Sequence, residues 1–178
     1  MQLLQPGAGT VHSATVPLMT RTVERRYDRG PRELVEGMVS EEYQRDRGEA
    51  LGGLAPSTIT RDGDLATVRW PRRLPLDSLP SQLRKFAGDG KVTQVERWTS
   101  VTDDRATAEW ESESKLPGKV SGTFEVVRDG DGAVYRVTAT AKVSIPLIGG
   151  RIASEVEDQV VKLIEQEMDF AEGWLRSH

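Results

Sequence analysis

The sequence of 178 residues predicts an α+β fold in which a curved antiparallel sheet of six to seven strands wraps around one long C-terminal helix. Apolar residues alternate strictly from Ala133 to Ile145, which places every second side chain on one face of a long strand. Apolar residues then recur at helical spacing from Gly150 to Ser177. This strand and this helix each extend roughly 40 Å, so the helix can lie along the apolar face of the strand.

The elements at the start of the chain are short. Thr20–Asp28 alternates weakly and predicts a first strand, which ends at Gly30. Two short helices follow the first strand. Pro31 favours the first turn of one that runs to about Met38, and Ser40 suits the N-cap of a second that ends near Gly48.

Four Asp-Gly pairs further along the chain predict hairpins, because the favoured two-residue turn requires positive φ. The segments around these pairs predict strands at Ser57–Arg61, Leu65–Arg72, Lys91–Val101, Arg105–Ser114, Val120–Arg128 and Ala133–Ile145.

One long connection interrupts these hairpins. Its leucines and Phe86 are spaced by three or four residues between Leu76 and Phe86, which predicts a short amphipathic helix that covers one end of the core. Alternatively, Leu79, Leu83 and Phe86 form a mobile lid over the opening of a cavity and touch a membrane or a partner.

Composition argues against several classes of protein. The chain has no cysteine, and its two histidines, His12 and His178, lie in the lead-in and at the last position, so we predict no catalytic residue, no metal site and no cofactor. The net charge of −4 argues against nucleic-acid binding, and no run approaches the ~20 apolar residues of a membrane span. We expect a disordered lead-in at residues 1–19 without the features of a secretory signal, a folded domain at residues 20–178, and a cytoplasmic location.

The charge is unevenly distributed along the chain. Residues 149–178 contain three basic and seven acidic residues, whereas residues 65–91 contain six basic residues and two acidic ones. Either these are solvated surfaces, or the basic segment attracts an anionic head group or a membrane surface, which would make transient membrane contact possible.

Several segments resemble one known family. The stretches VTQVERWTS, GKVSGTFEV and VSIPLIGGRIASEVEDQVVKLIEQE are similar to domain-of-unknown-function family 2505 (DUF 2505). The resemblance covers roughly Thr20 to Arg176, and its most specific part is the hinge IPLIGG at Ile145–Gly150. That family lies within the START-like (SRPBCC) helix-grip superfamily of lipid-transfer proteins, aromatic polyketide cyclases and pollen-allergen relatives. The resemblance implies a helix-grip fold and a hydrophobic ligand, and it transfers no catalytic residue.

The candidate ligand-binding residues face the space between sheet and helix, where small residues such as Ala106 and Gly122 leave room. The predicted cavity lining is Trp70, Glu96, Trp98, Ala108, Trp110, Phe124, Tyr135, Val137, Ala139, Val156, Val160 and Leu163. The alternative is that the tryptophans, including Trp174, fill this space as ordinary core.

The orientation of the strand at residues 91–101 is open at this point. If Trp98 points inward, Gln94 and Glu96 do too, and a buried Glu96 needs a partner. Arg69, Arg136 or a ligand hydroxyl could be that partner. In the opposite orientation Val95 is buried and Glu96 faces water. Besides these groups, Tyr27 and Tyr135 could orient a ligand.

These observations predict a protein that binds or carries a hydrophobic small molecule, such as a lipid or a polyketide-like compound, between the sheet and the C-terminal helix. One alternative is an enzyme of the polyketide cyclase or dehydratase kind, which an inward Glu96 beside Tyr135 or Tyr27 would favour. Another is a regulatory or interaction module whose cavity has closed.

Overall fold

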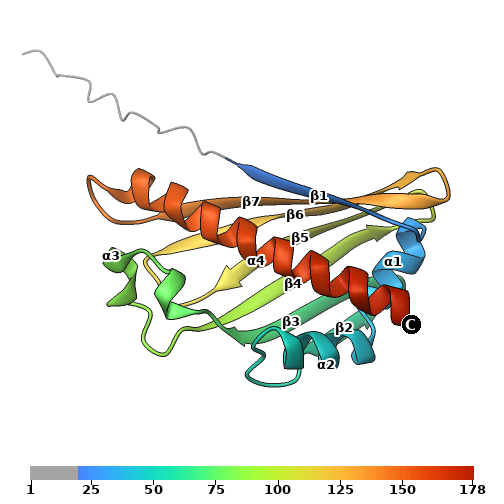
Figure 1. The fold of residues 1–178 in the computed structure, drawn as a ribbon, viewed down its shortest axis with the longest axis horizontal. Helices are drawn as coiled ribbons and strands as arrows, with labels where there is room; N and C mark the ends of the chain where they lie inside the picture. The colour runs from blue at the N-terminus through green and yellow to red at the C-terminus, as the bar shows by residue number, and fades with distance from the viewer. Residues whose placement is uncertain (1–19) are drawn as a thin grey trace, which may run out of the picture.

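The computed structural model describes residues 20–178, so the predicted lead-in at residues 1–19 lies outside the described residues. Seven strands form one antiparallel sheet in the order β1-β7-β6-β5-β4-β3-β2 (Figure 1). The strands are β1 (Arg21–Tyr27), β2 (Thr58–Asp62), β3 (Leu65–Arg73), β4 (Lys91–Val101), β5 (Arg105–Glu113), β6 (Gly118–Asp129) and β7 (Gly132–Val143). The helices are α1 (Pro31–Met38), α2 (Glu41–Ala50), the 3₁₀ turn η1 (Leu76–Ser78), α3 (Ser81–Arg84) and α4 (Gly149–Ser177).

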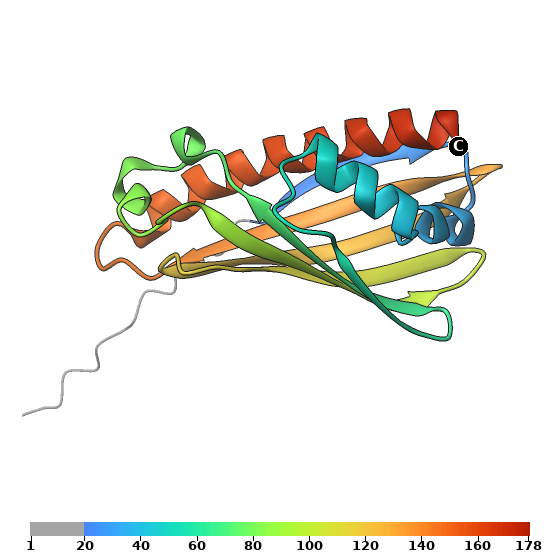
Figure 2. The same cartoon turned by 90° about the horizontal axis from the view of Figure 1, so that it is seen from below.

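The helices all cover the same face of the sheet. Helix α4 crosses that face along the length of the molecule (Figure 1), and the second view shows the sheet as the opposite layer, with α2 and α3 on the side of α4 (Figure 2). The predicted fold is therefore confirmed: a curved antiparallel sheet grips a long C-terminal helix, and two short helices follow the first strand.

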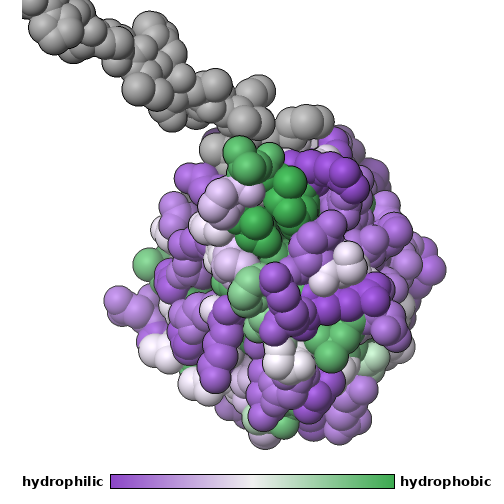
Figure 3. All heavy atoms as spheres, turned by 90° about the vertical axis from the view of Figure 1, so that its left-hand side faces the viewer, coloured by the Kyte–Doolittle hydropathy of each residue, from purple (hydrophilic) through white to green (hydrophobic). Residues whose placement is uncertain are grey.

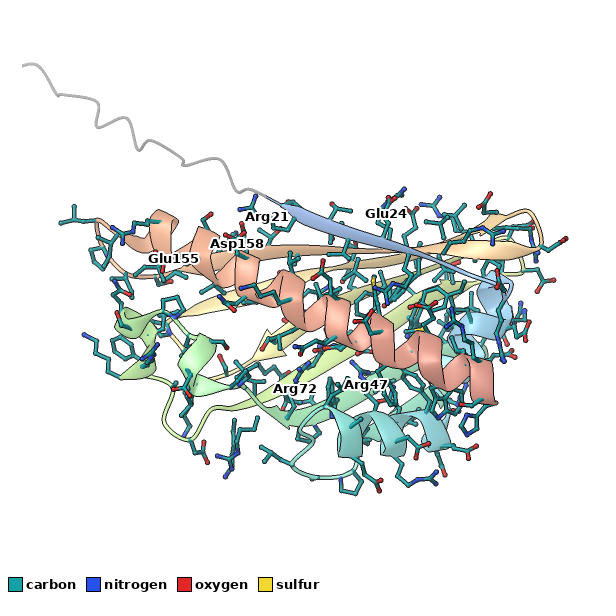
Figure 4. All side chains as sticks on the ribbon, in the orientation of Figure 1. Arg21, Glu24, Arg47, Arg72, Glu155 and Asp158 are labelled. Carbon is teal, nitrogen blue, oxygen red and sulfur yellow. The ribbon has the colours of Figure 1, made fainter. Side chains whose placement is uncertain are left out.

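Helix α4 is tied to β1 and β7 along one flank. Arg21 of β1 pairs with Asp158 of α4 at 2.9 Å (Figure 4), and the Tyr27 hydroxyl donates to the carbonyl of Met168 at 3.2 Å. The buried Glu157 accepts a hydrogen bond from the backbone N–H of Ala141 at 3.0 Å. Since β1 pairs with β7 only as far as Ala139, the Glu157 carboxylate takes the place of a neighbouring strand there.

One glycine allows an aromatic ring to cross the sheet. Trp110 pairs with Gly122 on the next strand, and its indole Nε1 donates to the carbonyl of Thr138 at 2.9 Å. A Cβ atom at Gly122 would lie 2.7 Å from that nitrogen and would collide with the Thr138 carbonyl oxygen. Only glycine therefore leaves room for this arrangement.

The prediction of one continuous short helix between Leu76 and Phe86 is wrong. Two separate turns, η1 and α3, stand on either side of Leu79 and Pro80. Proline has no backbone N–H and disfavours the helical conformation in the residue before it, and Leu79 is indeed extended (φ −79°, ψ 141°). Leu79 and Leu83 are buried, whereas Phe86 is 42% exposed.

The ends of the last strand and helix also differ slightly from the prediction. Strand β7 ends at Val143, which is the last residue paired with β6, and not at Ile145. The core-facing side of α4 includes the buried Ile164 and Leu175. Of the helices in the described part of the chain, none has the length and apolar character that a membrane crossing requires.

Candidate functional site

A cavity of about 110 Å³ lies between the sheet, α4 and the segment that contains α3. Its α4 wall runs from Val156 to Ala171, a distance of about 22 Å at 1.5 Å per residue. At the α3 end, Leu83 packs with Ile152 and Val156 of α4 and borders the cavity. The opposite end reaches Tyr43 and Arg47 of α2, so the cavity is long, mostly apolar and polar at its inner end.

Ten of the predicted ligand-contacting and lid residues line this cavity. They are Leu79, Leu83, Glu96, Trp110, Phe124, Tyr135, Val137, Val156, Val160 and Leu163. The other five lie outside the lining: Trp70, Phe86, Trp98, Ala108 and Ala139.

Packing explains these five positions. Trp98 packs in the core with its ring centroid 5.9 Å from that of Phe124, and Ala108 and Ala139 lie in the same core cluster. Phe86 turns outward with the Lys85 Nζ 4.9 Å from its ring. Among the four tryptophans, therefore, Trp110 contributes to the cavity wall.

Trp70 lies beneath the polar end of the cavity. The guanidinium carbons of Arg47 and Arg72 lie 4.0 and 4.1 Å from the centroid of its ring. A cation over an indole face is a favourable contact, and it is stronger where water is excluded. Trp70 is fully buried, so its ring positions both guanidinium groups without reaching the cavity itself.

Strand β4 turns Gln94, Glu96 and Trp98 inward, and all three are buried. Val95, on the opposite face, is also fully buried. The partner of Glu96 is Arg47 of α2, at 2.7 Å, and the suggestion of Arg69 or Arg136 is wrong.

Arg69 and Arg136 instead form ion pairs on the outer face of the sheet. Arg69 pairs with Glu113 at 2.6 Å, and Arg136 pairs with Glu125 at 2.7 Å and also with Glu24. These carboxylates are partly exposed, as the alternation of β5 predicts for Glu113. Neither arginine lines the cavity.

Five side chains form a connected network at the polar end of the cavity, which we call the inner network: Arg47, Arg72, Gln94, Glu96 and Glu167. Arg47 Nη2 donates to Glu96 Oε1 at 2.7 Å and to Glu167 Oε2 at 2.9 Å. Gln94 Nε2 donates to Glu96 Oε1 at 2.9 Å, and Arg72 Nη1 donates to Glu167 Oε1. Two arginines face two glutamates, so the inner network carries no net formal charge.

The inner network joins separate elements of the fold. Arg47 comes from α2 and Arg72 from β3, and both lie in the space between these elements and α4 (Figure 4). Burial alone would raise the pKa of Glu167, but the charges of Arg47 and Arg72 outweigh it and lower that pKa below its usual value. Glu167 is therefore ionised at neutral pH and holds both arginines toward α4.

Two tyrosine hydroxyls face the polar end without a partner. Tyr43 and Tyr135 both line the cavity, and within residues 20–178 neither hydroxyl makes a hydrogen bond. Burial, with a smaller contribution from the charge of Glu96, raises the pKa of Tyr135 well above its ordinary value. Both phenols are thus protonated at neutral pH, since burial also raises the pKa of Tyr43.

Sequence reasoning missed Tyr43, Arg47, Arg72 and Glu167. Tyr43 and Arg47 are four residues apart on α2 and share one helix face, which was the available signal. The strongly polar sequence of α2 hid this signal, because arginine is seldom buried unless it is paired.

The α3 end of the molecule carries exposed apolar residues. Leu147 is completely exposed in the hinge before α4, and Ile148 and Phe86 are each 42% exposed. Leu147 also has a φ of 69°, a left-handed conformation that is uncommon for a residue other than glycine. Figure 3 views this end and shows apolar residues gathered among polar ones.

Comparison with known proteins places this geometry in a family. A family model described as a protein of unknown function, DUF2505, matches residues 13–175. The chain belongs to the DUF2505 family. A search of curated proteins by sequence found no match.

Solved structures similar to this DUF2505 chain show the same helix-grip fold. Protein TTHA0849 from Thermus thermophilus is 17% identical with a TM-score of 0.56, and the match covers 87% of this chain and 95% of that one. Norcoclaurine synthase from Thalictrum flavum is 13% identical with a TM-score of 0.59, covering 100% and 98%. Ara h 8.0201 is 12% identical with a TM-score of 0.55, covering 91% and 100%. These likenesses confirm the helix-grip fold that the sequence resemblance implied for this DUF2505 chain.

Proposed function

We propose that this domain binds or carries a small hydrophobic molecule in the cavity between the sheet and α4. The observation that carries this proposal is the shape and chemistry of the cavity, whose mostly apolar lining extends about 22 Å along α4 and includes a polar inner end. Small-molecule sites typically combine an apolar lining with a few fixed polar groups. The norcoclaurine synthase structure, which has a similar fold, is a complex with dopamine and hydroxybenzaldehyde, and it supports a ligand-holding role for this architecture.

The cavity must widen to accept such a ligand. Its volume of about 110 Å³ is below the roughly 300–1,000 Å³ of typical ligand pockets. The segment at the α3 end consists of two short turns interrupted by Pro80, and the N-cap residues of both turns, Pro75 and Pro80, are prolines whose side chains form no cap. Its side-chain hydrogen bonds are internal to the segment, from Ser78 to the carbonyl of Pro75 and from Arg84 to that of Leu79. We therefore propose that Leu79 and Leu83 move outward as a lid when a ligand enters. Phe86 turns outward at the end of this segment.

The binding test uses a substitution that fills the cavity. Val160 lines the cavity and is partly buried, so Val160→Trp places an indole in the ligand's space. Lys162→Trp adds the same ring at an exposed position of α4 and is the matched control. With N-phenyl-1-naphthylamine as the fluorescent probe, we expect Val160→Trp to weaken binding at least tenfold and Lys162→Trp to leave it unchanged. Equal binding by both variants would refute the cavity as the site.

Native mass spectrometry of the purified chain, followed by organic extraction, tests for a natural ligand. Co-purified hydrophobic molecules lost in Val160→Trp support the proposal. A chain that never carries a bound species and does not bind the probe would favour the alternative of an interaction module with a closed cavity.

We further propose that the α3 end makes transient contact with a membrane, from a cytoplasmic location, when the ligand is exchanged. The exposed Leu147 and Ile148 and the neighbouring Lys85 beside Phe86 support this contact, since an apolar tip with basic residues suits an anionic bilayer surface. Co-sedimentation with phosphatidylserine vesicles tests it. Leu147→Glu should reduce the bound fraction, whereas Leu65→Glu, at the exposed start of β3, should not.

The polyketide cyclase or dehydratase alternative has one observation in its favour. Glu96 and Tyr135 line the same cavity, as that reading requires. However, Glu96 is fixed in position by Arg47 and Gln94, which both already donate to its Oε1. Binding without reaction is therefore the function that the geometry supports better.

A further inference from the structure

The inner end of the cavity has hydrogen-bonding groups that the protein does not use. Glu96 is only 4% exposed, and its Oε1 accepts from both Arg47 and Gln94. Its other oxygen, Oε2, accepts no hydrogen bond from any residue in the described range 20–178. The hydroxyls of Tyr43 and Tyr135 also make no hydrogen bond within this range, although both side chains are more than nine-tenths buried.

These groups are open to the cavity. Within residues 20–178, the side-chain atoms that are fully enclosed and lack a hydrogen-bond partner are other ones, so Glu96 Oε2 and the two tyrosine hydroxyls are not sealed inside the core. The three side chains line one end of the cavity, on α2, β4 and β7. A molecule in the cavity can therefore reach them and supply the partner that the described chain does not.

The chemistry of these three groups restricts the partner. A carboxylate oxygen can only accept a hydrogen bond, so the molecule that meets Glu96 must donate one. A tyrosine hydroxyl can both donate and accept, and the raised pKa of Tyr135 keeps its proton in place. A single hydroxyl group on a ligand satisfies both requirements at once.

The charge of the inner network argues against an anionic ligand. Its two arginines are matched by Glu96 and Glu167, so an added carboxylate would bring an uncompensated charge next to Glu96. An anion could still bind at Arg72, because its Nη2 has no hydrogen-bond partner in the part of the chain that the structure describes. The Nε of Arg47 also lacks a partner there, but it is fully enclosed. Arg72 also borders a second pocket on the outside, beside Ala50 and Leu51.

We infer that the cavity selects a neutral, apolar molecule that carries a hydroxyl group, such as a phenol or an alcohol. The hydroxyl donates to Glu96 Oε2 and accepts from Tyr135, while the rest of the molecule lies along the cavity lining toward α3. This inference rests on the proposed ligand-binding function and narrows its ligand class.

The test compares three compounds that share one ring system. 2-Naphthol carries a neutral hydroxyl, 2-naphthoic acid a carboxylate, and 2-methylnaphthalene neither. Titration calorimetry of the full chain at neutral pH should give an affinity for 2-naphthol about tenfold above that of the other two, because only 2-naphthol can donate a hydrogen bond to the charged acceptor while remaining neutral.

A matched pair of variants locates the hydroxyl. Tyr135→Phe removes a hydroxyl without a partner in the described chain, so it should leave the fold intact and lower the 2-naphthol affinity about fivefold or more. Tyr27→Phe removes a hydroxyl that already donates to Met168, so it should leave that affinity unchanged. Binding of 2-methylnaphthalene should be the same in both variants. Glu96→Gln provides a second reading, since it should abolish the preference for 2-naphthol over 2-naphthoic acid.

The outcomes separate this inference from the proposed function. If all three compounds bind equally, or if Tyr135→Phe binds 2-naphthol as the parent does, the hydroxyl selection is wrong and the binding function stands. Tighter binding of 2-naphthoic acid would assign the polar contact to Arg72 and would also overturn the inference. If none of the three binds and N-phenyl-1-naphthylamine does not bind either, the proposed function itself fails.

Discussion

Replacement of Arg47 by methionine tests whether the inner network holds the molecule together. Arg47 is 3% exposed and bonds to Glu96 and Glu167 at 2.7 and 2.9 Å. Arg47→Met keeps most of the apolar stem but leaves two buried carboxylates without this partner. Removing one member of a buried ion pair costs about 3–5 kcal/mol, which is a large part of the roughly 5–15 kcal/mol of a typical domain.

The measurement is urea unfolding followed by tryptophan fluorescence and circular dichroism. We expect the free energy of unfolding to fall by about 3–5 kcal/mol and the midpoint of thermal unfolding to fall by roughly 10 °C. Arg45→Met is the matched control on the same helix. Arg45 is exposed and pairs with Glu42 and Asp46 at the surface, so its loss should cost less than about 1 kcal/mol.

The pH dependence adds a second criterion. Without Arg47, the pKa of Glu167 rises relative to the parent because one of the two charges that lower it is gone. The folded parent therefore loses more stability than the folded variant as the pH falls, and the deficit of Arg47→Met should be larger at pH 7 than in the acid range where Glu167 takes up its proton. A loss no greater than that of Arg45→Met, or a deficit independent of pH, would refute the assigned role of the inner network.

Other parts of the structure lead to three more expected outcomes. Because the pKa of Glu167 is lowered in the folded state, its stabilisation is present at neutral pH and lost as the pH falls below about 4, so the acid unfolding of Glu167→Gln should be shallower than that of the parent. Gly122→Ala forces a Cβ against Trp110 and Thr138 and should cost about 1–3 kcal/mol in urea unfolding, with a change in tryptophan emission. Ser40→Ala removes the N-cap of α2 and should cost about 1 kcal/mol in the same assay, and Ser40→Asp should restore most of it.

The sequence predicted the strands well because their signals are local. The Asp-Gly pairs at Asp62 and Asp129 lie in the β2–β3 and β6–β7 hairpins, and Gly63 and Gly130 have the positive φ that these turns require. The alternating burial predicted for β7 is also present in the structure. In a strand, the position of a residue alone decides whether its side chain faces the core or the outer surface.

The inner network could not be predicted in this way. The position of Arg47 depends on how α2 packs against β4 and α4, and Glu96 and Glu167 are 71 positions apart in the sequence. The alternation of β4 left two orientations open, and the structure selects the one in which a buried arginine compensates a buried glutamate. A distant partner of this kind leaves no periodic signal in the residues around it.

The attachments of α4 have a mechanical consequence. Its flank toward β1 and β7 is fastened at several points, through Arg21, Tyr27 and Glu157, and none of these three side chains lines the cavity. On the other flank, the cavity is bounded by η1, α3 and the paired charges of Arg72 and Glu167. We therefore expect the cavity to open by movement of η1 and α3 away from α4, while α4 stays attached to β1 and β7.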